Sequence, residues 1–143
     1  MNITYTDTIS AEDCNKLRKS AGWSQMHLDQ ITTGLKNSAF IVVAKDGETT
    51  VGMARVISDG GYIVLVVEVL VLPEYQRKGI GKTMMEKIME FLRNKLKDGY
   101  CIQVDVMAAK GKEDFYEKFG FVKRPNDSFG FGMTQWLKKE DSQ

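Results

Sequence analysis

The segment from residue 72 to residue 83 carries the residue types best suited to binding a charged ligand. Its two glycines, Gly79 and Gly81, let a ligand approach the backbone without a Cβ in the way. Three cations stand beside them: Arg77, Lys78 and Lys82. A helix that begins here offers unpaired backbone N–H groups and the positive end of its dipole, which together bind phosphate. The spacing therefore predicts a phosphate-binding turn.

Two other interpretations of this segment compete with that one. Gly81-Lys82-Thr83 is similar to the end of the P-loop, GxxxxGK[ST], but the first glycine of that motif would fall on Gln76. The loop therefore cannot wrap phosphates as a P-loop does. An ordinary helix cap without a ligand is the second alternative, and it leaves the glycines and the cations at one cap unexplained.

Hydrophobic periodicity and turn residues predict an α/β order in which a long helix connects two strands. Apolar residues in 79–97 recur at intervals of three and four, and Asp46-Gly47 indicates a tight hairpin turn. Ser10 is expected to cap the first helix. The near-continuous apolarity of Tyr62–Leu72 predicts a central strand. Strands are expected at 3–5, 39–45, 50–57, 62–72, 101–107, 121–123 and 129–137, and helices at 10–20, 26–35, 79–97 and 113–119.

Composition excludes several classes of protein. The 143 residues predict one domain, 1–143, and 20 basic against 19 acidic side chains leave no excess charge for nucleic acid or a membrane surface. The longest apolar run is far shorter than the ~20 residues of a membrane-spanning helix. A lone His27 and two separated cysteines, Cys14 and Cys101, predict no metal site and free thiols. A cytoplasmic location is expected.

Two motifs resemble those of the GNAT superfamily of N-acetyltransferases. Gln76-x-x-Gly79-x-Gly81, after a valine-rich strand, resembles the acetyl-CoA signature of this family, Q/R-x-x-G-x-G/A. Residues 115–121, FYEKFGF, resemble the second signature, FYEK-x-GF. The family asparagine after the fifth strand is missing from 107–112, where Lys110 or Lys112 could replace it. The order of expected elements also agrees with the family, so the resemblance spans essentially the whole chain.

The resemblance implies a fold, a cosubstrate and an activity. The expected fold is α/β, with a mixed, mostly antiparallel sheet of six to seven strands flanked by about four helices. The expected activity is that of an acyltransferase that moves the acetyl group of acetyl-CoA to a primary amine, with no metal. The residues expected to bind acetyl-CoA are Val69, Leu70, Val71, Gln76, Arg77, Lys78, Gly79, Ile80, Gly81 and Lys82. The backbone amides of the first three are candidates for the donor to the acetyl carbonyl.

Attack by an amine requires a base, because an alkylamine with a pKa of about 10.4 is almost wholly protonated at pH 7. Glu68 is the leading candidate, as the single charge in 63–72, and partial burial is expected to raise its pKa. Asp105, Asp59 and water are the alternatives. Tyr116, in the second signature, is the expected acid that protonates the leaving thiolate. On its helix it is rotated away from Phe115 and Phe119, so it is expected to point towards the cleft.

The acceptor is not specified by any motif. A small-molecule or peptide amine is expected, and Trp23, His27 and Phe131 are weak candidates for contacting it, since aromatics in these segments can equally be core. A homodimer is plausible for the family. A non-catalytic module of the same fold that senses acyl-CoA is the alternative function.

Overall fold

The computed structural model describes residues 1–139, which fall into two compact units, Met1–Val106 and the residues from Met107 onward. Each unit is described by itself, and the prediction of one domain stays a prediction. No helix within the described residues is long and apolar enough to cross a membrane.

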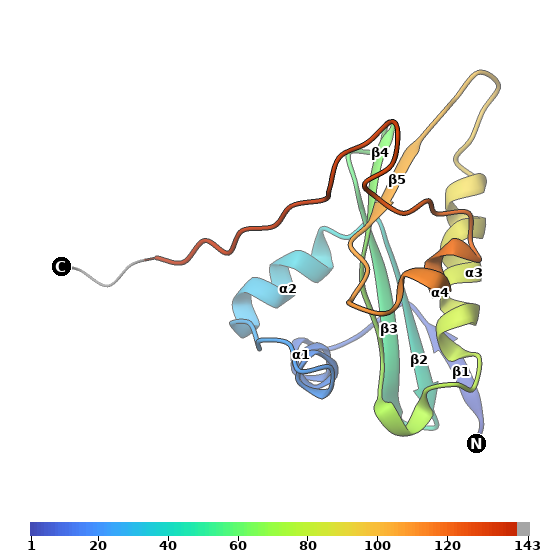
Figure 1. Cartoon of the computed structure of the whole chain (residues 1–143). Helices are drawn as coiled ribbons and strands as arrows, with labels where there is room; N and C mark the ends of the chain where they lie inside the picture. Colours follow the sequence, from blue (N-terminus) through green and yellow to red (C-terminus); the bar gives the residue numbers. More distant parts are fainter. Residues whose placement is uncertain (140–143) are drawn as a thin grey trace. The chain divides into compact units, whose positions relative to one another are not determined.

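The first unit is built on a five-stranded sheet in the order β1-β2-β3-β4-β5 (Figure 1). Neighbouring strands are antiparallel except β4 and β5, which are parallel and are connected through the long helix α3. The prediction of a mixed, mostly antiparallel sheet with one crossover is confirmed. The strands are β1 (Ile3–Thr6), β2 (Phe40–Asp46), β3 (Thr49–Ser58), β4 (Ile63–Val71) and β5 (Gln103–Val106).

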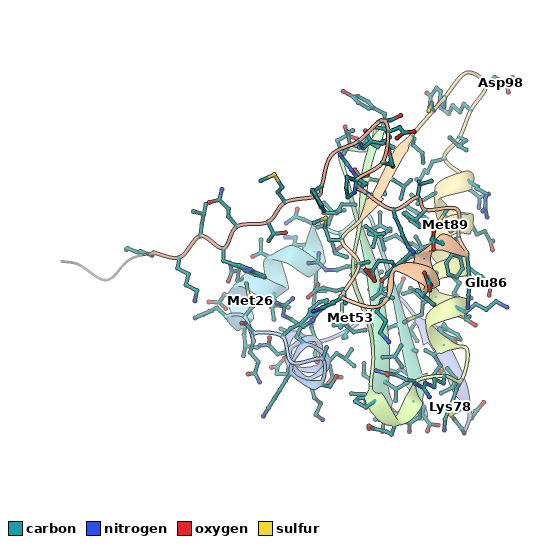
Figure 2. The ribbon with its side chains drawn as sticks, in the orientation of Figure 1. Met26, Met53, Lys78, Glu86, Met89 and Asp98 are labelled. Atoms are coloured by element: carbon teal, nitrogen blue, oxygen red, sulfur yellow. The ribbon has the colours of Figure 1, made fainter. Side chains whose placement is uncertain are left out.

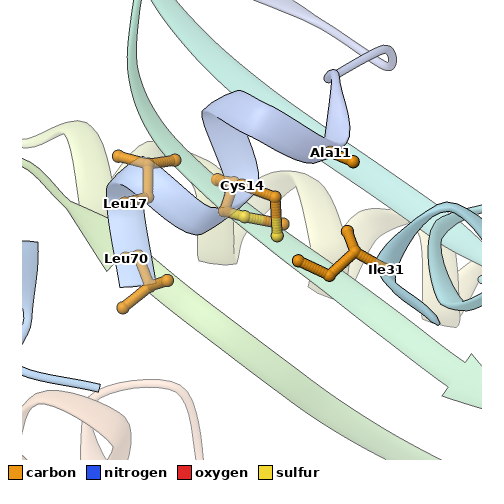
Figure 3. Packing of buried hydrophobic residues seen from close by; sticks show 6 residues of the cluster. Ala11, Cys14, Leu17, Ile31 and Leu70 are labelled. Atoms are coloured by element: carbon orange, nitrogen blue, oxygen red, sulfur yellow. The ribbon is translucent and has the colours of Figure 1, made fainter. Parts of the chain in front are cut away.

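Helices cover both faces of this sheet. Figure 1 shows α1 (Ala11–Ser20) and α2 (Leu28–Lys36) on one face and α3 (Ile80–Arg93) on the other. A one-turn 3₁₀ helix, η1 (Pro73–Tyr75), leads from β4 to α3. Beneath α1 and α2 the core contains Ala11, Cys14, Leu17, Ile31, Met53 and Leu70 (Figure 3). The apolar stripe expected on α3 is confirmed for Met85, Ile88 and Leu92, which are buried. It does not extend to Leu96, because α3 ends at Arg93 and Leu96 is 44% exposed.

The first helix begins where the sequence predicts. Ser10 is the N-cap of α1, and its Oγ accepts a hydrogen bond from the N–H of Asp13 at 3.0 Å. Without that acceptor the N–H loses its partner at the helix end. We expect Ser10→Ala to lower the free energy of unfolding by about 0.5–2 kcal/mol in urea denaturation. Ser24→Ala removes an exposed hydroxyl that caps no helix, and an equal loss in that control would contradict the capping role.

One expectation about the sheet is confirmed and one is wrong. Strand β4 lies between β3 and β5, so it has the central position expected of Tyr62–Leu72. The described residues contain five strands, not six or seven, because 121–123 and 129–137 form none. Phe131 and Met133 are 73% and 90% exposed. Apolar alternation alone does not make a strand, since a strand needs a neighbour to pair its N–H and C=O groups. The glycines at 130 and 132 further weaken the tendency of this segment to form a strand.

The second unit contains one helix, α4 (Glu113–Glu117), within the part that is described. The chain turns after it at Gly120, whose φ of 91° lies in the left-handed region that glycine adopts readily after a helix end. With α1, α2 and α3 this makes four α-helices among residues 1–139, in agreement with the expected number of about four.

Candidate active site

Strand β4 is interrupted by a bulge that places an acidic residue in a left-handed conformation. Leu70 lies opposite Met53 and Val67 lies opposite Arg55, so two residues of β4, Glu68 and Val69, oppose Ala54 alone. Glu68 has a φ of 52°, which is costly for any residue with a Cβ. Bulges of this kind redirect side chains and end strand pairing.

Beyond the bulge, β4 has an open edge. Pairing with β5 ends at Val66, opposite Val106, and in residues 1–139 no strand continues it. The N–H of Leu72 donates to the carbonyl of Val51 on the β3 side at 2.9 Å. Because successive residues of a strand direct their peptide groups to opposite sides, those of Val71 point away from β3 and those of Leu70 point towards it. Of the candidate carbonyl donors, Val71 therefore presents its N–H at the open edge.

The side chain of Gln76 connects the turn between β4 and α3 to the open edge of β4. Its Nε2 donates to the carbonyl oxygen of Val71 at 2.9 Å, on the side that β5 does not reach. The side chain thus satisfies a backbone carbonyl that the sheet leaves unpaired. The neighbouring η1 is held by Tyr75, whose hydroxyl donates to Asp46 Oδ2 at 2.6 Å. Lys78, labelled in Figure 2 at the turn that leads into α3, has its Nζ 5.9 Å from the centroid of the Tyr75 ring.

The turn that enters α3 has the geometry of an anion site. Arg77 and Gly79 both have positive φ, at 62° and 83°, so the backbone folds tightly on itself there. Gly79 is the N-cap of α3, no side chain bonds to the first turn, and a Cβ added at Gly79 would meet nothing within 4 Å. Ile80 is buried and anchors the helix start, whereas Gly81 and Lys82 occupy the first turn. Unpaired N–H groups, a dipole and open space fit a phosphate.

The Glu68 carboxylate at the bulge forms ion pairs with two arginines. Its Oε1 lies 2.5 Å from Arg55 Nε on β3, and its Oε2 lies 2.7 Å from Arg18 Nη1 on α1. The thiol of Cys14 lies 3.9 Å from Oε2, and burial raises the pKa of that thiol to about 11. All three charged side chains are largely buried, with 9% of Glu68, 10% of Arg18 and 16% of Arg55 exposed. The carboxylate is therefore engaged on both oxygens.

The expectation that burial raises the pKa of Glu68 is wrong in its net direction. Burial does act to raise it, but hydrogen bonds and charge from Arg55 and Arg18 outweigh burial and lower the pKa. A carboxylate held below its ordinary pKa is a weaker proton acceptor. Its role as a base is a separate matter and stays a prediction.

The two arginines are functional candidates that the sequence interpretation missed. Each also contacts the segments around α2: Arg18 Nε donates to the carbonyl of Ser24 at 2.8 Å, and Arg55 Nη1 donates to Ser38 Oγ at 3.0 Å. One signal could have found Arg55, because it is the single charge of its strand just as Glu68 is of the next. Lone opposite charges on neighbouring apolar strands predict a pair.

Tyr116 lies in the second unit and is more buried than expected. Only 8% of it is exposed, and its ring makes edge contacts with Phe115 and Phe121 at 5.0 and 6.0 Å between ring centroids. That it points towards the cleft stays a prediction. Burial raises the pKa of Tyr116 to about 12.

Tyr116 keeps its phenolic proton at neutral pH, because burial raises its pKa. A protonated phenol can donate a hydrogen bond to a ligand.

The weaker candidates have ordinary local roles. Trp23 stacks against Arg18, with 5.4 Å from the guanidinium carbon to the ring centroid, and His27 Nδ1 caps α2 by accepting from the N–H of Asp29. Phe131 belongs to the second unit and is exposed. The alternative bases are also engaged: Asp59 accepts N–H groups of its own turn, and Asp105 accepts from Gln103 Nε2 at 2.7 Å.

Known proteins resemble this chain in sequence. Residues 36–123 match the model of the acetyltransferase (GNAT) domain family, which is more than half of the chain. An uncharacterized N-acetyltransferase of Porphyra purpurea is 29% identical over 128 residues, which cover 87% of this chain and 71% of that protein.

Solved structures resemble the fold. A Staphylococcus aureus protein of unknown function, described as a probable acetyltransferase, is 32% identical with a TM-score of 0.83, and the match covers 94% of this chain and all of that one. AAC(6')-Iy, solved in complex with the bisubstrate analogue CoA-S-monomethyl-acetylneamine, shares the fold. It is 15% identical with a TM-score of 0.67, and the match covers 94% of this chain and all of that one. Among residues 1–139 no cluster of potential ligands could hold a metal ion.

Proposed function

Because the chain belongs to the GNAT family of acetyltransferases, we propose that it moves the acetyl group of acetyl-CoA to a primary amine by direct attack. The observation that carries this proposal is the combination of two features. Within residues 1–139, strand β4 has an open edge, and no side chain bonds to the first turn of α3. Both lie in one unit and are joined by η1, so they can hold two parts of one extended ligand.

In this proposal, the phosphates of acetyl-CoA bind at the start of α3. The N–H groups of the first turn donate to phosphate oxygens, and Arg77, Lys78 and Lys82 add positive charge. The acetyl group then lies at the open edge of β4, where the Val71 N–H donates to its carbonyl oxygen. That bond strengthens as negative charge develops on the oxygen during attack.

The reaction forms a C–N bond and breaks the C–S bond of the thioester. The nitrogen lone pair attacks the acetyl carbon, the electrons of the C–S bond leave with sulfur, and the amine gives up one proton. Tyr116 is the proposed donor to the thiolate, supported by its place in the second signature and by a raised pKa that keeps it protonated.

The geometry changes the sequence-based assignment of the group that accepts the amine proton. Glu68 was predicted as the base, but its oxygens are held by two guanidinium groups and its pKa is lowered. Solvent water is the acceptor that this arrangement favours, because the amine can enter neutral or lose its proton to water before attack. The role of Glu68 is developed in the next subsection.

An acetylation assay over a panel of amines tests the proposed function. We expect the protein to release coenzyme A thiol, measured with a thiol reagent, in the presence of at least one class of small amine or amine-bearing peptide. The acetylated amine should accumulate in equal amount, as mass spectrometry would show. Binding of acetyl-CoA without thiol release from any class would instead support an acyl-CoA sensor of the same fold.

A further inference from the structure

The bulge of β4 is held by charges from two other elements. Glu68 takes a left-handed φ of 52° although it has a side chain, so something must hold this conformation in place. The two ion pairs do so: Arg55 comes from the opposite strand and Arg18 from α1 on the covered face of the sheet. A residue clamped at both carboxylate oxygens cannot move without breaking one of these contacts.

The bulge in turn sets the direction of the strand end. Val69 follows Glu68 directly and Val71 lies two residues further on. The register shift at the bulge determines which of their peptide groups face the open edge. Peptide groups alternate in orientation along a strand. If β4 lacked the extra residue of the bulge, each peptide group after it that now faces the open edge would face β3 instead. The donor proposed for the acetyl carbonyl therefore depends on the bulge.

We propose that Glu68, Arg18 and Arg55 form a positioning clamp for the acetyl group, in which Glu68 acts through the backbone of β4 and not as a proton acceptor. This inference rests on the proposed function. It assigns catalytic importance to two arginines that neither family motif contains. It also explains why a carboxylate near the expected site is neutralised by two partners, an arrangement that would hinder a base.

The clamp also reaches the segments that cover this face of the sheet. Arg55 Nη1 donates to the carbonyl of Gly34 at 3.2 Å, near the end of α2, and Arg18 Nε donates to the segment between α1 and α2. The same side chains thus connect α1 and α2 with the bulge. Misplacement of a reacting group by about 1 Å can cost roughly a hundredfold in rate, so small shifts here suffice.

The test compares Glu68→Gln, Arg55→Gln and the double variant in steady-state acetylation assays. The clamp predicts that each single variant lowers kcat by about 10- to 100-fold. The double variant should be no slower than the slower single variant, because each of the three variants disrupts the same group of interacting residues. Affinity for coenzyme A without its acetyl group should stay within threefold, since the α3 start is untouched. A variant that had merely lost its fold would lose this affinity as well.

The pH profile separates the clamp from a base. If Glu68 positions the acetyl group, the loss in Glu68→Gln is the same factor between pH 7 and pH 10. A base role predicts that the loss shrinks as pH rises and more amine is already neutral, and that Arg55→Gln retains activity because it frees the carboxylate. Either result, or full activity of Glu68→Gln at pH 7, would overturn the proposal.

Matched controls and the wild type complete the design. Glu90→Gln and Arg93→Gln make the same chemical changes at exposed positions on α3 and should leave kcat unchanged. If a single variant fails to fold because one buried charge is left unpaired, the double variant removes both charges of the Arg55 pair and supplies the kcat and pH comparison. Absence of acetylation by the wild type would count against the proposed function, and is measured first.

Discussion

Gly81→Glu is expected to abolish the stabilisation that acetyl-CoA gives the folded protein. At a hundredfold excess over Kd, a ligand that binds only the folded state adds about 2.7 kcal/mol, or roughly 8 °C in Tm for a domain of this size. The variant adds a side chain and a negative charge in the first turn of α3, where the phosphates are proposed to bind. The measurement is the thermal shift with and without acetyl-CoA.

Gly130→Glu is the matched control for this prediction. Gly130 does not have a positive φ, and a Cβ there would meet nothing within 4 Å, so the same change is made in open space in the second unit. Its thermal shift with acetyl-CoA should equal that of the wild type. A shift that survives in Gly81→Glu would place the phosphate site elsewhere on the molecule.

Tyr116→Phe is expected to slow the chemical step by about one to three powers of ten, or roughly 1.4–4 kcal/mol of barrier. The change removes a hydroxyl and keeps a ring that contacts Phe115 and Phe121, so the fold should persist. Acetyl-CoA affinity should also be unchanged. Single-turnover measurement of thiol release isolates this step from product release.

The pKa of about 12 changes the pH dependence expected of this tyrosine. A coenzyme A thiol has a pKa of about 8.5, so full transfer from such a phenol is uphill by about 5 kcal/mol, and donation must accompany C–S cleavage. Because burial raises the pKa, the acid form persists to higher pH. No alkaline fall in kcat from this group is expected below about pH 11.

Tyr100→Phe provides the comparison for this prediction. Tyr100 lies after α3 and is 54% exposed, so losing its hydroxyl should leave kcat at the wild-type value. Equal rates in wild type and Tyr116→Phe, with the chemical step limiting, would mean that Tyr116 only packs. The thiolate would then leave unassisted or take its proton from water.

Local features could be predicted from the sequence because their causes are local. The cap at Ser10, the left-handed Gly120 and the start of α3 each depend on residues within one turn of chain. The crossover from β4 to β5 follows from a change of hydrophobic period along adjacent segments. Family membership followed from two motifs, each also confined to a short stretch.

What the sequence by itself determined was therefore the order of elements, the glycine turn that can accept a phosphate and the family. Only the tertiary structure decided what Glu68 does, because its partners Arg18 and Arg55 lie 50 and 13 residues away in the chain. It also decided that 129–137 forms no strand within the described part of the chain, since pairing depends on a neighbour and not on alternation. A lone carboxylate buried among apolar residues is expected to have a raised pKa. Folding brings two guanidinium groups to Glu68, and they lower its pKa instead.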